Sequence, residues 1–273
     1  MKKILLFLKT TMAVPQPLGP FHLIAVFLMI LITFCVCFFF GNADEKTFRV
    51  ILVVIWAIMF TMEGIKQLEE SYTISADGDF LWRYNWGTFP LQLCDSPLYL
   101  LLPIAFMKDG KLREALSAFM YTYILLGGIS TFILISTTFG TNVYCNVQTL
   151  AHHGLQVVSC TFIAVHNRRR ISREAFGGAL SVFLCAVGIA TLFNVVVHYF
   201  VPDQVVNMFF ISPFFKKTMP ILNDAWSKLH WLPTIALYVV GVSVLAFAVF
   251  SLFRQIFSKE DVKESVQKVC AGN

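Results

Sequence analysis

The sequence is poor in charged residues and has few of the long polar stretches that cover a soluble domain. Asp, Glu, Lys and Arg make up 14% of its 273 residues, whereas hydrophobic residues make up 57%. Soluble proteins carry about a quarter charged residues, so this composition excludes an ordinary soluble globular domain. The phosphate-binding patterns GxGxxG and GxxxxGK[ST] do not occur either, so no sequence motif indicates a nucleotide-binding fold.

Paired cysteine spacings are also missing. The chain has seven cysteines, most of them inside apolar runs, and an odd number argues against a scaffold held together by disulfides. None of the spacings typical of a zinc site is present. We therefore expect most of these cysteines to pack as small apolar side chains, and we predict no metal and no other cofactor.

A strong excess of positive charge is absent as well. The net charge is +5, and there is no array of basic and aromatic residues of the kind that follows a phosphate backbone. Nucleic acid is therefore not an expected partner. The basic residues lie in loops and at the C-terminus, where they suit the anionic head groups of a membrane.

Long apolar runs are what the sequence does contain. A run of roughly 18 or more apolar residues predicts a transmembrane helix, and the mean hydropathy of the chain is +0.71. We predict an all-α polytopic transmembrane helical bundle of about seven spans. The spans lie at about residues 21–40, 48–66, 88–107, 112–136, 149–166, 175–200 and 232–257.

These runs define the predicted organisation of the chain. Residues 21–257 form a single transmembrane domain, and residues 258–273 a cytosolic tail. The apolar patch in residues 1–20 is too short for a signal peptide, so we expect a short interfacial N-terminal segment. Pro202, Pro213 and Pro220 interrupt the stretch before the last span, which favours a re-entrant or interfacial loop there.

The distribution of Lys and Arg predicts the orientation in the membrane. The sequences MKDGKLRE and NRRRISR and the C-terminal tail hold many of the 21 basic residues. In a seven-span protein these segments lie on one side. We therefore predict a multi-pass protein of the cell membrane with its N-terminus outside and its C-terminus cytosolic. Lys2, Lys3 and Lys9 favour the opposite orientation.

Alternation of the spans places polar residues from four of them at one depth. Ionisable groups inside spans are costly and usually face the bundle interior or a wet cavity. The sequence therefore predicts a polar site in the outer half of the membrane. Its candidate members are Glu63, Cys94, Asp95, His152, His153, Asn194 and His198.

Most of these residues also have a purely structural interpretation. Glu63 can pair with Lys66 on its own helix, and Asp95 can accept hydrogen bonds in a turn interrupted by prolines. Asn194 and His198, four residues apart, can hold two helices together. The three histidines of this layer and Glu63 offer zinc ligands, but without a recognised spacing.

The fifth predicted span distinguishes its two histidines. Gln148, His152 and Gln156 recur every four residues and form one polar stripe. His153 lies on a less polar face with Val157. His152 is therefore the histidine that we expect to point inward, where it can act as a base for a nearby cysteine.

Cys94 is the candidate nucleophile. A cysteine beside an imidazole can form a thiolate–imidazolium pair, and in a membrane the available electrophiles are lipid esters and thioesters. The oxyanion of the reaction needs hydrogen-bond donors, for which Gln92, Asn194 and His198 are candidates. Asp95 or Glu63 is a candidate for orienting the imidazole.

Three segments resemble a known family. WGTFPLQLCD, residues 86–95, resembles the Trp-Pro-Leu-x-Leu-Cys element of the YwaF family of bacterial integral membrane proteins. TLAHHGLQ, residues 149–156, is similar to the histidine-bearing span of that family. LFNVVVHYFVPDQVVNMFFISP and HWLPTIALYV are similar to its C-terminal part. The likeness covers roughly residues 20–257, and the shared order of the segments is its specific feature.

The resemblance implies an activity. The YwaF family is related to eukaryotic transmembrane protein 164, an acyltransferase of phospholipid remodelling thought to use a cysteine and a histidine. It more distantly resembles the androgen-dependent membrane hydrolases of fatty-acid esters. By motif, Cys94 is the acyl-accepting nucleophile and His152 its base. Gln92 stands where a histidine often precedes the cysteine, and His153 is a second candidate for the base.

We therefore expect an integral membrane lipid acyltransferase or acyl-ester hydrolase with a Cys94–His152 dyad in a membrane-embedded polar cavity. Its expected partner is a membrane phospholipid or another acyl-lipid substrate. The alternative is a carrier or binding protein for lipid or solute, whose polar cavity is not catalytic. The sequence does not decide between catalysis and binding, and it predicts no oligomeric state.

Overall fold

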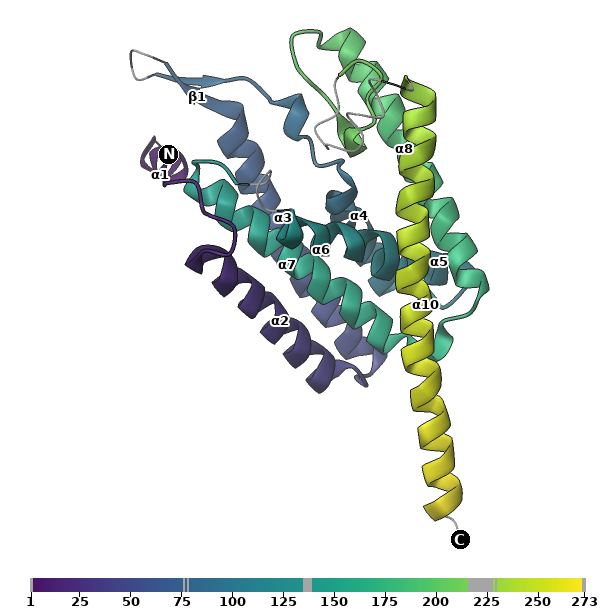
Figure 1. Cartoon of the computed structure of the whole chain (residues 1–273). Helices are drawn as coiled ribbons and strands as arrows, with labels where there is room; N and C mark the ends of the chain where they lie inside the picture. The colour runs from purple at the N-terminus through teal and green to yellow at the C-terminus, as the bar shows by residue number, and fades with distance from the viewer. Residues whose placement is uncertain are drawn as a thin grey trace.

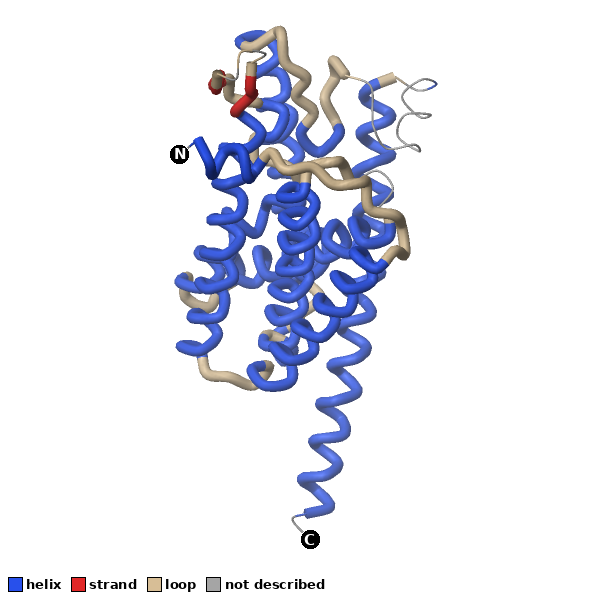
Figure 2. Tube along the Cα trace, turned by 90° about the vertical axis from the view of Figure 1, so that its left-hand side faces the viewer, coloured by secondary structure: helices blue, strands red, loops and turns tan. Residues whose placement is uncertain are grey.

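A computed structural model describes residues 2–75, 77, 79–134, 139–215, 228 and 230–271. The described residues form a helical bundle with irregular segments gathered at one end (Figures 1 and 2). The elements are α1 (Lys2–Leu8), α2 (Pro20–Phe40), α3 (Glu45–Ser71), β1 (Tyr72–Ile74), β2 (Phe80–Trp82), η1 (Trp86–Thr88), η2 (Leu93–Asp95), α4 (Ser96–Phe106), α5 (Lys111–Phe119), η3 (Met120–Ile124), α6 (Leu125–Ile133), α7 (Val143–His166), η5 (Arg168–Arg170), α8 (Glu174–Phe200), η6 (Met208–Phe210) and α10 (Trp231–Ala271).

Five described helices are long and apolar enough to cross a membrane. They are α2, α3, the continuous helix Lys111–Ile133 formed by α5, η3 and α6, α8, and the Trp231–Ser258 part of α10. They coincide with five of the predicted spans. The prediction of an all-α, multi-pass membrane protein is therefore confirmed.

The other two predicted spans, 88–107 and 149–166, do not meet this criterion of length and apolarity among the described residues. In the first, the α-helix starts only at Ser96 and has 11 residues. The second lies within α7, which has 24 residues but carries a polar stripe. Because α7 packs against α2, α3 and α6, it needs little apolar surface toward lipid. The count of seven crossings remains a prediction.

The turn between α2 and α3 is fixed by a helix cap. The Asp44 carboxylate accepts a hydrogen bond of 2.9 Å from the backbone N–H of Thr47, which satisfies one of the free donors of the first helical turn. This bond lowers the pKa of the Asp44 carboxyl. The cap starts α3 at Glu45, so that the helix runs back along the bundle and carries Glu63 and Lys66 to the opposite end.

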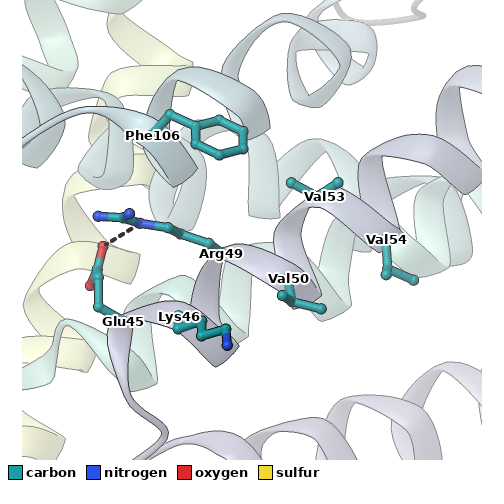
Figure 3. A pocket seen from close by; sticks show the side chains of 7 residues that line it. All are labelled: Glu45, Lys46, Arg49, Val50, Val53, Val54 and Phe106. Atoms are coloured by element: carbon teal, nitrogen blue, oxygen red, sulfur yellow. Dashed lines mark ion pairs between the residues drawn. The ribbon is translucent and has the colours of Figure 1, made fainter.

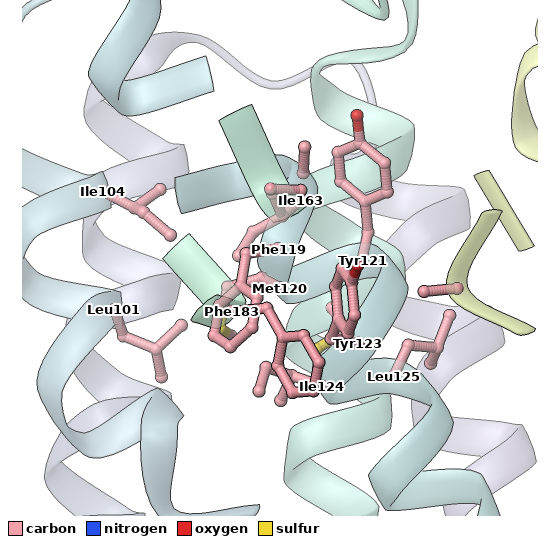
Figure 4. Packing of buried hydrophobic residues seen from close by; sticks show 14 of the residues in the cluster. Leu101, Ile104, Phe119, Met120, Tyr121, Tyr123, Ile124, Leu125, Ile163 and Phe183 are labelled. Atoms are coloured by element: carbon pink, nitrogen blue, oxygen red, sulfur yellow. The ribbon is translucent and has the colours of Figure 1, made fainter. Parts of the chain in front are cut away.

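The apolar core surrounds the helix Lys111–Ile133 (Figure 4). Phe119, Met120, Tyr123 and Ile124 are fully buried there, and Tyr123 stacks on Phe183 of α8 with ring centroids 4.4 Å apart. By contrast, α2 packs mainly on α7, and only His22 of its residues is buried. The first span is therefore a peripheral helix, as its uniformly apolar sequence predicts.

Glycine allows α5 and α8 to approach closely. A Cβ atom on Gly178 of α8 would lie 2.6 Å from the Cβ of Ala115 on α5. Such a distance is a steric clash, so the contact requires glycine at this position. The close packing of α5 on α8 places the rest of α8, including Asn194, beside the centre of the bundle.

The N-terminal segment is attached to the end of the bundle that carries the irregular segments. The Lys9 ammonium lies 2.9 Å from the Glu69 carboxylate at the end of α3, and Met12 N–H donates to the carbonyl of Thr141. The short helix α1 lies in the predicted N-terminal segment, whose interfacial position remains a prediction. At the C-terminus, α10 continues without a break to Ala271 and extends beyond the other end of the bundle (Figure 1).

Candidate functional site

The segment 86–95 is a pair of short turns that precede α4. Residues Trp86–Thr88 and Leu93–Asp95 each form one 3₁₀ turn. In the second turn the Asp95 carboxylate accepts a hydrogen bond of 2.8 Å from the backbone N–H of Gln92. Pro97, in the first turn of α4, lacks an N–H group where the helix needs none. Cys94 therefore lies just before a helix, and the prediction of a span running through residues 88–95 is wrong at this point.

Two side-chain amides join residues 84–95 to residues 201–212, and a third joins residues 201–212 to α8. Each amide bonds to the backbone of another segment through both its nitrogen and its oxygen. Gln92 donates to Asn207 O at 3.1 Å and accepts from Phe209 N–H at 2.7 Å. Gln204 donates to Tyr84 O at 2.8 Å and accepts from Trp86 N–H at 2.7 Å.

The third amide belongs to α8. Asn194 donates to Met208 O at 3.0 Å and accepts from Met208 N–H at 2.7 Å. It is fully buried, and a buried backbone group without a partner is costly. Gln92, Asn194 and Gln204, which we call the amide clamps, therefore hold residues 84–95 and 201–212 in one arrangement.

The two clamped segments also touch directly. A Cβ atom on Gly87 would lie 2.7 Å from the carbonyl oxygen of Val205, so the contact requires glycine. Phe209 and Phe210 both adopt left-handed backbone conformations, with φ of 55° and 59°. Such conformations are costly for large side chains and persist where surrounding contacts impose them. The Gln92 and Asn194 clamps supply these contacts.

His152 lies against Cys94. Its ring is buried, with 2% of the residue exposed, as the polar stripe of α7 predicts. Its Nε2 lies 3.2 Å from the backbone carbonyl oxygen of Cys94 and 3.9 Å from the Asp95 carboxylate. The structure thus brings Cys94, Asp95 and His152 together from two segments that are 58 residues apart.

The hydrogen bond to the carbonyl identifies the tautomer of His152. A carbonyl oxygen only accepts, so in the neutral ring Nε2 carries the proton. The Nδ1 atom is buried and has no hydrogen-bond partner in the described part of the chain. Nδ1 is therefore the basic nitrogen of the resting ring.

A second polar cluster borders Asp95 and Cys94. The Glu63 carboxylate, 3% exposed, accepts hydrogen bonds from Lys66 at 3.1 Å, Gln67 at 2.7 Å and Gln148 at 3.2 Å. The Lys66 ammonium also interacts electrostatically with Asp95 and Cys94. The predicted pairing of Glu63 with Lys66 is confirmed, and the pair lies inside the polar layer.

Gln67 links this cluster to the 84–95 segment. Its amide donates to the carbonyl of Thr88 at 2.6 Å and accepts from the hydroxyl of Tyr84 at 2.7 Å. Burial, followed by the negative charge of Glu63, raises the pKa of the Tyr84 phenol. Tyr84 is therefore a hydrogen-bond donor at neutral pH, and it covers the cluster from the side of the loops.

The remaining two predicted residues lie farther from Cys94. His153 bonds to the carbonyl of Thr149 on its own helix at 2.7 Å, although its ring centroid is 5.6 Å from that of His152. His198 stacks on Phe214 with centroids 3.8 Å apart. None of the contacts of His198 among the described residues reaches Cys94 or His152.

The sequence did not identify three residues of this site. Lys66 entered only as a structural partner of Glu63, whereas Gln204 and Asn207 lie in a segment interpreted as a loop. Lys66 is a charged residue within an apolar run and lies beside Glu63, and this pattern could have identified it as a member of the site. Gln204 bonds to residues 118 and 120 positions away, and local patterns carry no information on such contacts.

Metal-ligating groups gather elsewhere. In the described residues, Glu69, Glu70 and Cys145 place their ligand atoms within 4.8 Å of one another. The Glu69 carboxylate is already bonded to Lys9 at 2.9 Å and to Asn142 at 2.8 Å, so its charge is balanced without a metal. The zinc ligands considered from the sequence do not form such a group in the described structure.

A comparison with known protein families matches most of the chain. Residues 17–254 match the TMEM164 family, a range that extends from before α2 into α10 and includes Cys94 and His152. No curated protein and no solved structure gives a significant match. The resemblance to relatives of transmembrane protein 164 is confirmed, whereas membership of the bacterial YwaF family remains a prediction. The chain belongs to the TMEM164 family.

Proposed function

We propose that this protein transfers or hydrolyses acyl groups of membrane lipids by means of a covalent intermediate on Cys94. The observation that carries the proposal is the contact between the His152 ring and Cys94, 3.2 Å from Nε2 to the backbone carbonyl oxygen. This contact places a buried imidazole against the backbone of a cysteine inside a membrane protein. Nucleophilic acyl transfer requires a thiol with an adjacent base, so the proposed reaction requires the Cys94 side chain to turn its sulfur to Nδ1 of His152.

The first half of the reaction forms a thioester. The imidazole of His152 takes the thiol proton of Cys94, and the thiolate sulfur attacks the carbonyl carbon of a lipid ester. The tetrahedral intermediate then collapses, and the bond from carbon to the ester oxygen breaks. The leaving alkoxide takes the proton from the imidazolium, which releases a lysolipid and restores neutral His152.

The second half regenerates the enzyme. The hydroxyl group of a lysolipid or of water gives its proton to His152 and attacks the thioester carbonyl. The carbon–sulfur bond breaks, and the Cys94 thiolate recovers the proton from the imidazolium. A lysolipid acceptor yields a remodelled phospholipid, and water yields a free fatty acid.

Asp95 and the Glu63–Lys66 pair stabilise the charges of this cycle. The Asp95 carboxylate lies 3.9 Å from Nε2 of His152, where it can stabilise the positive charge of the ring while the ring holds the transferred proton. Lys66 interacts electrostatically with Cys94 and places a positive charge in the layer where the thiolate forms during the reaction. Glu63 balances Lys66, so the layer carries paired charges rather than isolated ones.

We assign Gln92 and Asn194 a positioning role. Both amides are bonded to the backbone of residues 207–209 through nitrogen and oxygen, and Gln92 N–H also binds Asp95. Gln92 therefore links the turn of Cys94 to the segment opposite. In this arrangement the amides keep Cys94 fixed against His152, which catalysis by proximity demands.

We further propose that the chain crosses the membrane seven times, with its N-terminus outside. The helix α7 and the segment that ends in α4 supply the two crossings beyond the five long apolar helices. The Cys94 layer then lies near the outer surface, and the C-terminal end of α10 is cytosolic. Cysteine accessibility labelling on intact cells tests this orientation.

A labelling experiment tests the covalent mechanism. Purified protein in mixed micelles is incubated with phosphatidylcholine that carries a radioactive acyl chain, and label on the protein is tested for release by hydroxylamine. We expect a hydroxylamine-sensitive label that Cys94→Ala abolishes and that Cys185→Ala, a change at an exposed cysteine of α8, leaves intact. Lipid that binds without any covalent label would instead identify a carrier.

A further inference from the structure

A second candidate site lies at the N-terminal end of α3, whereas the layer that contains Glu63 and Cys94 lies near the C-terminal end of this helix. A cavity of about 450 Å³ opens there between the first turns of α3 and the end of α4 (Figure 3). Its polar lining is Glu45, Lys46 and Arg49. Glu45 and Glu63 are 18 positions apart on one helix, or roughly 27 Å at the rise of an α-helix, so this cavity is separate from the candidate active site.

The apolar lining of the cavity is exposed on the outer surface of the bundle. Val50 is 54% exposed, Val54 is 52% exposed and Phe106 is 63% exposed, and Val53 lies with them. α3 is one of the helices long and apolar enough to cross a membrane. The valines continue along α3 from the charged turn toward the middle of the span, as an acyl chain does below its head group.

The acidic residue of the cavity is neutralised by groups behind it. The Glu45 carboxylate forms an ion pair with the buried guanidinium of Arg113 and lies 3.7 Å from His166. It also lies 3.6 Å from Nε of Arg49. Arg113 is held in turn by the carbonyl of Ile104 at 2.8 Å. The charge of Glu45 is thus directed into the bundle.

The two other cations of the first turns are accessible to a ligand. Lys46 has no carboxylate within ion-pair distance among the described residues. Arg49 lies 3.6 Å from Glu45 through Nε, and its side chain is 44% exposed. The nearby Asp44 carboxylate caps Thr47. Lys46 and Arg49 therefore place two positive groups beside an apolar, outward-facing wall.

We propose that this cavity binds an anionic phospholipid of the leaflet that contacts the α2–α3 turn. The phosphate lies between the Lys46 ammonium and the Arg49 guanidinium, and one acyl chain lies along Val50 and Val54 toward Phe106. The charges select an anionic head group. The exposed valines select a lipid over a soluble phosphate, because only a lipid covers them.

Binding to the purified full-length protein tests the proposal. Delipidated protein in maltoside micelles is titrated with dioleoyl phosphatidylglycerol or dioleoyl phosphatidylcholine, and bound lipid is counted by native mass spectrometry. We expect the anionic lipid to bind more tightly. At about fivefold per basic residue, the double change Lys46→Gln with Arg49→Gln should weaken it about 25-fold and leave phosphatidylcholine unaffected.

Two further variants separate the possible causes. Val54→Trp fills the apolar part of the cavity without changing charge, and it should also weaken the anionic lipid. The control Lys111→Gln removes an exposed charge outside this cavity and should have no effect. Lys46→Gln alone breaks no ion pair, so its affinity is informative even if Arg49→Gln unfolds the protein.

Three outcomes would overturn the proposal. The first is equal affinity of the wild-type protein for the two lipids. The second is unchanged affinity for the anionic lipid in folded Lys46→Gln and in the double variant. The third is displacement of the lipid by millimolar inorganic phosphate, which would identify a site for a free anion instead.

Discussion

The two ends of α3 each carry a glutamate in an ion pair, but in different surroundings. The Glu63 side chain is 4% exposed and bonds to three side chains beside Cys94 and His152. The Glu45 side chain is 39% exposed and borders an open cavity with apolar walls. Buried, fully paired groups hold a fixed geometry, whereas exposed cations beside apolar surface remain available to lipid. We therefore assign chemistry to the first end and lipid binding to the second.

The largest expected effect is on catalytic activity, which should depend on His152 near the C-terminal end of α3 and not on Lys46 at its N-terminal end. His152→Ala should lower the rate of acyl transfer by roughly 10²- to 10⁴-fold, the usual contribution of a general base, whereas Lys46→Gln should leave the rate in neutral lipid unchanged. The measurement is transfer from labelled phosphatidylcholine, with the melting temperature as a folding control. Full activity in His152→Ala together with its loss in His153→Ala would show that the neighbouring histidine is the base.

The next effect concerns stability. Glu63→Gln should destabilise the protein by about 3 kcal/mol, because it leaves the charge of Lys66 buried without its carboxylate. Glu45→Gln should cost only about 1 kcal/mol, because Glu45 is partly solvated and the buried Arg113 keeps its ion pair with Asp109. Unfolding free energies in mixed micelles compare the two. Equal losses of unfolding free energy in the two variants would show that the two ion pairs contribute equally to stability.

A smaller effect is expected from the amide clamps. Gln92→Ala removes the bonds to Asn207 and Phe209 and leaves buried backbone groups unpaired, which should cost about 1–3 kcal/mol. Hydrogen exchange of the Phe209 amide should become faster, and that of residues 45–54 should not change. Unaltered exchange at Phe209 would mean that Gln92 does not hold this segment.

The smallest effect tests the direct contact of the two loops. Gly87→Ala adds a Cβ atom 2.7 Å from the carbonyl oxygen of Val205, and this clash should cost about 1–2 kcal/mol. The matched change Gly64→Ala, in α3, meets no atom within 4 Å and should be neutral or slightly stabilising. The melting temperatures of the two variants measure this difference. A Gly87→Ala variant as stable as the wild type would contradict the close contact between Gly87 and Val205.

The apolar helices were predictable because membrane crossing leaves a strong signal in the sequence. Runs such as residues 21–40 and 175–200 are long, apolar and free of charge over most of their length, and they appear as α2 and α8. The third predicted span was only partly correct. Apolarity alone does not distinguish a helix from two 3₁₀ turns, the second of which contains Cys94. Pro90, between the two turns, has no N–H group and prevents the regular hydrogen bonding of an α-helix there.

The site was predictable in part for a similar reason. The spacing of Gln148, His152 and Gln156 placed His152 on the buried face of α7, because helix periodicity is a local property. The clamps of Gln92 and Gln204 join residues more than a hundred positions apart, and no local pattern encodes them. The stacking of His198 on Phe214 is another contact that no local pattern encodes.

The most direct test of the account is to locate the acyl group on the chain. Wild-type protein is quenched in acid during turnover of a defined phosphatidylcholine, digested, and analysed by mass spectrometry for acylated peptides. We expect an added acyl mass on the peptide that contains Cys94, and we expect this mass to be greatly reduced in His152→Ala. An acyl group found on another residue, or none on Cys94 while lipid is turned over, would contradict it.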